Sequence, residues 1–165
     1  MATTTHGNLT VSASGDAAER RLALAGRLDE TVALVDHLGG WGAEVVVLET
    51  AGIQAINSLG IREWMHFVAG LNGGGARLVH EKCSEVLVEQ MCFIPAVRAG
   101  GAVRSFHAPY YCQRCDLESS ALIDVEIHGE GLRAMKAPGL PCPQCKGAMT
   151  LADVPERIFA FLVEH

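Results

Sequence analysis

Four of the six cysteines stand in two pairs of the form Cys-x-x-Cys. The pairs are Cys112 with Cys115 and Cys142 with Cys145, and the 26 residues 116–141 separate them. Two intervening residues let one tight turn direct both sulfurs at a single cation, and two such turns complete a tetrahedron. Zn²⁺ suits four thiolates, and four protein ligands leave no position open for water or substrate. The spacing predicts one structural zinc ion per chain, with disulfide pairing as the alternative.

The residues around these cysteines predict a small unit of their own. From 108 to 150 the chain has four cysteines, four of its six prolines and almost no helical periodicity. The alternation over Leu122–His128 predicts one arm of a hairpin, followed by a loop over 129–141. The unit resembles a zinc ribbon, and we expect it to cover residues 108–150.

Nucleic-acid binding is the alternative role for such a ribbon. Residues 112–150 hold four Lys and Arg against five Asp and Glu, and four minus five is a net −1. The whole chain has a net charge of −6 and a pI near 5.6. Because nucleic acid and anionic lipid both require a basic face, we expect neither as a partner. An adaptor that bound nucleic acid through the ribbon would show affinity that falls steeply with salt.

Composition and the first residues place the chain among folded cytoplasmic proteins. At 165 residues and 49% hydrophobic content it can build one core with a small annex. The start MATTTHGNLT lacks the pattern of a leader, and no apolar run approaches the roughly 18 residues of a membrane span. Cytosolic thiols stay reduced, so Cys83 and Cys92 are expected to be buried structural thiols.

The stretch 43–72 predicts a strand, a short loop and a helix. Val45 to Leu48 are apolar and mostly β-branched, as in a strand buried on both faces. Asn57 and Ser58 stand where helix N-caps stand. The apolar positions of the following helix are Ile61, Trp64, Met65, Val68 and Leu71. Ser58 is thus expected at a sheet edge and a helix N-terminus, where negative charge is favoured and a hydroxyl is well placed to be modified.

The remaining elements complete an α/β pattern. Strands are expected at 8–14, as an edge strand that forms a hairpin with 21–28, and at 76–79 and 97–106, with a loop at the glycine run 72–75. Helices are expected at 31–38, capped by Asp29, and at 85–91, capped by Ser84. Their order predicts a mixed β-sheet with flanking helices. The tail 151–165 should form a helix with Ile158, Phe161 and Leu162 on one face, which is stable only when docked.

Three segments of the first hundred residues together resemble the STAS domain, the family named for sulfate transporters and anti-sigma-factor antagonists. They are LALAGRLD at 22–29, VVVLETAGIQAINSLGIREW at 45–64 and ARLVHEKCSEVLVEQM at 76–91. The family typically shows Asp-Ser-Ser-Gly after its strand, and the loop here reads Asn57, Ser58, Leu59, Gly60. Glu49 stands where Asp is usual.

The resemblance implies a STAS-like domain over 1–107 in a bacterial, cytoplasmic signalling protein. In the antagonist branch, a partner kinase phosphorylates the serine that corresponds to Ser58, although here Asn57 replaces the acidic neighbour. We therefore expect a non-enzymatic regulator whose partner contacts Asn57, Ser58, Leu59 and Arg62. The ribbon would add a second contact surface or a homodimer face. The alternative, an enzyme, would need a cleft with a perturbed acid or base, and the sequence offers no such cluster.

Overall fold

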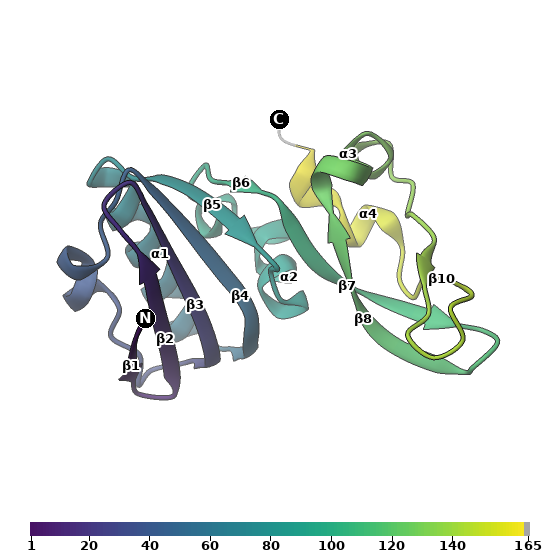
Figure 1. Ribbon diagram of the computed structural model, residues 1–165, viewed down its shortest axis with the longest axis horizontal. Coiled ribbons are helices and arrows are strands. Elements are labelled where there is room, and N and C mark those ends of the chain that lie inside the picture. Colours follow the sequence, from purple (N-terminus) through teal and green to yellow (C-terminus); the bar gives the residue numbers. More distant parts are fainter. Residues whose placement is uncertain (164–165) are drawn as a thin grey trace.

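The computed structural model describes residues 1–163, which form two β-sheets side by side (Figure 1). Within these residues the first sheet has the strand order β1-β2-β3-β4-β5-β6, and the second has the order β8-β7-β10-β9. The predicted mixed α/β fold is confirmed. The strands are β1 (Ala2–His6), β2 (Leu9–Gly15), β3 (Glu19–Leu28), β4 (Val45–Ile56), β5 (Arg77–Glu81), β6 (Ala102–Val103), β7 (Ser105–Cys112), β8 (Leu117–Asp124), β9 (Leu140–Pro141) and β10 (Ala148–Leu151).

Helices cover one face of the first sheet and leave the other open. In Figure 1, α1 lies behind the strands, and the face toward the viewer has no helix over it. No helix among residues 1–163 is both long and apolar enough to span a bilayer. The α-helices are α1 (Ser58–Gly73), α2 (Glu85–Phe93), α3 (Val125–Arg133) and α4 (Pro155–Ile158), and the 3₁₀ helices are η1 (Val35–Gly40), η2 (Pro95–Val97) and η3 (Ala160–Leu162).

Strand pairing changes direction within the first sheet. β1, β2 and β3 are antiparallel neighbours, whereas β3 to β6 run parallel. The hairpin predicted from 8–14 and 21–28 is confirmed. The edge position predicted for 8–14 is wrong, because β1 pairs outside β2. The three threonines of β1 are β-branched and suit a strand, so the first residues of the sequence do carry a signal for β1.

Strand β4 is central, as predicted. It pairs with β3 on one side and with β5 on the other, and Val46, Val47 and Leu48 are fully buried. Pairing with β5 stops at Glu49, so the rest of β4 extends past the end of β5 toward α1. β4 is therefore longer than the apolar run Val45–Leu48 predicted, because pairing with β3 continues the strand to Ile56.

The two predicted helices that follow β4 and β5 are confirmed. Helix α1 buries the stripe that begins at Ile61, and the indole of Trp64 donates a hydrogen bond to the Val97 carbonyl at 2.9 Å. Helix α1 continues to Gly73, into the glycine run that was expected to be a loop. Helix α2 begins after Ser84, but the Ser84 side chain makes no capping hydrogen bond.

The helix predicted over 31–38 is wrong. The chain there is irregular until η1, and Val32 and Leu34 are both buried in the core. The Glu63 carboxylate accepts hydrogen bonds from the backbone N–H of Leu34 (2.8 Å) and Val35 (2.9 Å). Asp29 accepts from Thr31 in a turn instead of capping a helix. These partners from another element replace the hydrogen bonds that a helix would have made.

Two further predicted strands are partly wrong. The segment 97–106 is not one strand, because its first residue, Val97, belongs to η2 and the chain turns at Gly100, where φ is +71°, before β6 and β7. The arm predicted over 122–128 ends at Asp124, whose side chain accepts from the N–H groups of Glu126 and Ile127 and caps α3. The glycines of α3, Gly129 and Gly131, concealed that helix in the sequence.

The two sheets share one contiguous apolar core. The expected boundary at 107/108 falls inside β7, whose first residues bridge to Cys83 beside β5. The described part of the tail, 151–163, docks as predicted, whereas residues 164 and 165 of the predicted segment lie outside the described residues. Phe161 packs edge-on against Phe106 of β7 with ring centroids 5.0 Å apart, and Phe159 is fully buried nearby. The tail is a short α-helix followed by a 3₁₀ turn, and Phe159 was not among its expected core residues.

Candidate metal centre and the α1 terminus

The four cysteines of the two predicted pairs come together. Cys112 ends β7, Cys115 lies in the turn before β8, Cys142 follows β9 and Cys145 lies in the turn before β10. The four Sγ atoms all lie within 4.8 Å of one another, and all four thiols are free of disulfides. This confirms the predicted cluster and excludes the disulfide alternative. Four cysteines so arranged can hold a metal ion.

The two turns that present the sulfurs have matching backbone geometry. The residue after the second cysteine is left-handed in both, with φ of +51° at Asp116 and +63° at Lys146. In the second turn, the backbone N–H of Gln144 and of Gly147 donate to the sulfurs of Cys142 and Cys145, each at 3.4 Å. Because N–H donors favour the charged form of sulfur, this turn is preformed for thiolates.

The thiol pKa values differ across the cluster. The backbone N–H groups of Cys145 and Gln144 lower the pKa of Cys142 to about 7, so this residue forms a thiolate readily. The hydrogen bond with Cys145 raises the pKa of Cys115 to about 12. Four sulfurs this close cannot all be charged without a cation between them, since each thiolate opposes the next. The donor set therefore fits a cation that binds thiolates, and it closes the site to further ligands.

Two tyrosines directly precede the first cysteine pair. Tyr110 is fully buried and donates a hydrogen bond to the Pro138 carbonyl at 2.8 Å, and burial raises its pKa to about 12. Tyr111, on the other face of β7, donates to the Asp116 carboxylate. Both hydroxyls are therefore bonded to residues within 108–150. The other two cysteines lie elsewhere, Cys83 fully buried and Cys92 half-buried against the tail, and burial raises the pKa of both thiols.

The N-terminus of α1 presents the expected surface residues. Asn57, Ser58, Leu59 and Arg62 are all exposed. The cap is Asn57, whose Oδ1 accepts from the Gly60 N–H at 2.9 Å while its Nδ2 donates to the Glu30 carboxylate at 2.7 Å. Ser58 is the first helical residue, and its hydroxyl makes no hydrogen bond to residues 1–163. The Ser58 hydroxyl is therefore exposed at a capped helix end.

A glycine holds this helix end against the sheet. A Cβ at Gly60 would lie 1.9 Å from the carbonyl oxygen of Leu28, the last residue of β3. Only a residue without a side chain permits this approach, which explains the glycine after Leu59. Beside it, Asp29, Glu30 and Glu63 line a shallow groove of about 320 Å³ that also borders Leu59 and Arg62. Carboxylates thus outnumber the single arginine around Ser58.

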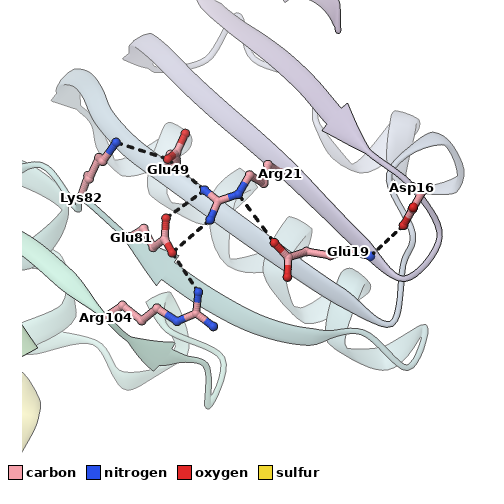
Figure 2. Close-up of polar contacts among 7 residues, drawn as sticks. All are labelled: Asp16, Glu19, Arg21, Glu49, Glu81, Lys82 and Arg104. Atoms are coloured by element: carbon pink, nitrogen blue, oxygen red, sulfur yellow. Dashed lines mark hydrogen bonds and ion pairs between the residues drawn. The ribbon is translucent and has the colours of Figure 1, made fainter. Parts of the chain in front are cut away.

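An ion-pair network that sequence analysis missed crosses the open face of the first sheet (Figure 2). Arg21 of β3 pairs with Glu49 of β4 at 3.1 Å and with Glu81 of β5 at 2.9 Å. Arg104 also pairs with Glu81, at 2.9 Å, and Lys82 with Glu49, at 3.5 Å. The hydrogen bonds from Arg21 hold the pKa of Glu81 below its ordinary value. The signal in the sequence is a glutamate at or near the end of the apolar run of each strand, Glu49 and Glu81, which parallel pairing places side by side.

Comparison of the chain with protein-family models, with curated proteins and with solved structures gives no match.

Proposed function

We propose that the protein is a non-enzymatic, cytoplasmic regulatory module that binds a partner protein through the N-terminal end of α1. The observation that supports this most is the exposed Ser58 hydroxyl beside Leu59, which is 54% exposed, on a helix end fixed by the Asn57 cap and by the contact at Gly60. A fixed, partly apolar surface around a modifiable hydroxyl suits a switchable contact. The partner would be a regulatory protein of the kinase or anti-sigma type, as the resemblance to the STAS domain implies.

The four-cysteine cluster has a structural role in this proposal. One Zn²⁺ would be held by Cys112, Cys115, Cys142 and Cys145, and it would supply folding free energy, because no position remains for substrate. The ion would fix the ends of β7 and β10 and thereby the second sheet, which would offer a second contact or homodimer surface.

Phosphorylation of Ser58 would act on the contact and leave the fold intact. A phosphate adds about −1.5 to −2 charges at a helix N-terminus, where the helix dipole favours them. Arg62 is the one cation among the residues that line the neighbouring groove, against three carboxylates. A partner that packs on Leu59 would have to desolvate a charge with little local compensation, which costs several kcal/mol when the charge is unpaired.

The test begins with recovery of the partner by pull-down from the native cell, with phosphosite mapping. Its affinity is then measured for Ser58→Asp, Ser58→Ala and Asn72→Asp. Asn72 is exposed at the opposite end of α1. The third variant therefore adds the same charge far from the proposed contact surface around Ser58. We expect Ser58→Asp to weaken binding at least about tenfold, or about 1.4 kcal/mol, and the other two to bind like the parent.

Thermal melts of all three variants serve as the folding control. If Ser58→Asp binds the partner as tightly as Ser58→Ala, Ser58 lies outside the contact surface and the proposed switch is wrong.

A further inference from the structure

A second helix terminus, that of α2, opens into a hollow between the two sheets. The hollow measures about 330 Å³ and lies where the second half of β4, the first turn of α2 and the β7–β8 pair meet. In Figure 1, α2 lies between β4 and this strand pair. The lining residues are Ala51, Ile53, Ser84, Glu85, Val86, His107 and Ser120. The hollow is separate from both the cysteine cluster and the α1 terminus.

Two polar side chains that line the hollow lack partners. Ser84 is only 7% exposed, and its Oγ is buried without a hydrogen bond to any described residue. The same holds for Nδ1 of His107. A serine at an N-cap normally accepts from the backbone N–H two or three residues on, but here Ser84 does not. Buried polar groups without partners are uncommon in folded proteins and costly. A polar ligand in this hollow could supply the partner that both groups lack.

The backbone adds further donors at the same place. Glu85 and Val86 are the first two residues of α2, and their N–H groups have no carbonyl partner within the helix. The hydroxyls of Ser84 and Ser120 can donate as well. Burial lowers the pKa of His107, so its neutral ring can present Nδ1 as a donor in one tautomer. The unpaired groups are therefore all able to donate, and their complement is an acceptor, best a negatively charged oxygen.

The charge and the apolar wall of the hollow limit which class of anion can bind. Glu85 is one of the residues that line the hollow, and its negative charge repels a doubly charged phosphate more than a singly charged carboxylate. Ala51, Ile53 and Val86 give one side an apolar wall that suits a short hydrocarbon chain. We propose that this hollow binds the carboxylate of a small organic acid, held by Ser84, His107 and the first backbone N–H groups of α2.

The experiment is an NMR titration of the isotopically labelled full chain. Sodium acetate, sodium butyrate, inorganic phosphate and N-acetylalanine are added in turn against sodium chloride at equal ionic strength. The amide signals of Ser84, Glu85 and Val86 are followed. We expect acetate to shift these amides and butyrate to bind more tightly, by up to about fourfold for each CH₂ group buried.

Variants test whether the proposed residues change butyrate affinity in the expected direction. Ser84→Ala should weaken butyrate binding about tenfold, as expected when a hydrogen bond to a charged group is lost. Glu85→Gln should strengthen it, because a repelling charge is removed. Ser119→Ala, one residue along β8 from Ser120 and on the other face, should change nothing. Ser84→Ala should melt no lower than the parent, because it removes a buried hydroxyl without a partner.

Four results would overturn the proposal. One is the absence of amide shifts beyond those of chloride, and another is equal butyrate affinity in Ser84→Ala and Ser119→Ala. Tighter binding of phosphate than of acetate would make the ligand class wrong. Tighter binding of N-acetylalanine than of butyrate would indicate a peptide C-terminus in place of a free acid.

Discussion

The substitution Phe161→Ala measures how much the docked tail contributes to the stability of the whole chain. Phe161 is 5% exposed, and its ring meets Phe106 edge-on at 5.0 Å with an interplanar angle of 90°. Truncation of a buried phenylalanine to alanine costs about 3–5 kcal/mol, within which an aromatic pair accounts for about 0.5–1.5 kcal/mol. Because a tail near the end of the chain can collapse onto the space left behind, we expect the lower end, about 3 kcal/mol.

That free energy converts into a measurable melting shift. For a chain of this size each kcal/mol moves Tm by about 2–4 °C, so Phe161→Ala should melt about 6–12 °C below the parent. Phe93→Ala is the matched control, because it makes the same chemical change at a side chain that is 72% exposed. Surface changes of this kind stay within about 0.5 kcal/mol. Thermal melts followed by circular dichroism, with urea unfolding at one temperature, compare the three proteins.

The outcome bears on what the tail is. If Phe161→Ala and Phe93→Ala melt alike, the packing against Phe106 adds nothing to stability and the tail is a detachable segment.

Three further perturbations test other parts of the structure. Cys142→Ser should lower the metal content from one zinc per chain toward none and unfold the second sheet; unchanged zinc by elemental analysis would contradict the site. Gly60→Ala should cost about 3–5 kcal/mol in urea unfolding, because its Cβ would lie 1.9 Å from the Leu28 oxygen, whereas Gly73→Ala, with no atom within 4 Å, should be neutral or slightly stabilising. Equal effects of the two would refute the close approach. Burial lowers the pKa of His80 from 6.5 to about 4. As the pH falls, the unfolded chain therefore binds a proton at His80 before the folded chain does, and the unfolding free energy should fall by about 3 kcal/mol between pH 6.5 and pH 4. An NMR titration that finds the pKa of His80 in the folded protein near 6.5 would contradict this.

Features that depend on residues close in sequence were predictable. Each cysteine pair is a local turn, so its spacing alone indicates where the sulfurs point. Helix α1 repeats its apolar residues over several turns, a pattern that few other structures give. The cap was expected at Asn57 or Ser58, and the contact that decides between them comes from the Gly60 N–H three residues on. Such short-range geometry can therefore be predicted from the order of residues alone.

Features that depend on distant partners were not predictable. The segment 31–38 has apolar residues at helical spacing, but the carboxylate of Glu63, far along the chain, accepts the N–H groups of Leu34 and Val35. These hydrogen bonds take the place of those that a helix would make. The Arg21 network exists only because parallel register aligns Glu49 with Glu81. The hollow at Ser84 was missed for the same reason, since a serine that lacks its capping bond cannot be told in sequence from one that makes it.

Strand β7 has a consequence for which insertions and deletions the chain can accept. Phe106, Ala108, Tyr110 and Cys112 are its alternate, buried residues, so one strand face serves the tail contact at one end and the sulfur cluster at the other. One residue gained or lost between Phe106 and Cys112 would turn every later side chain to the opposite face. The Cys112 sulfur would then point away from the other three cysteines. Chains that descend from this one should therefore vary in length in the loop between α3 and β9 and keep the number of residues in β7 constant.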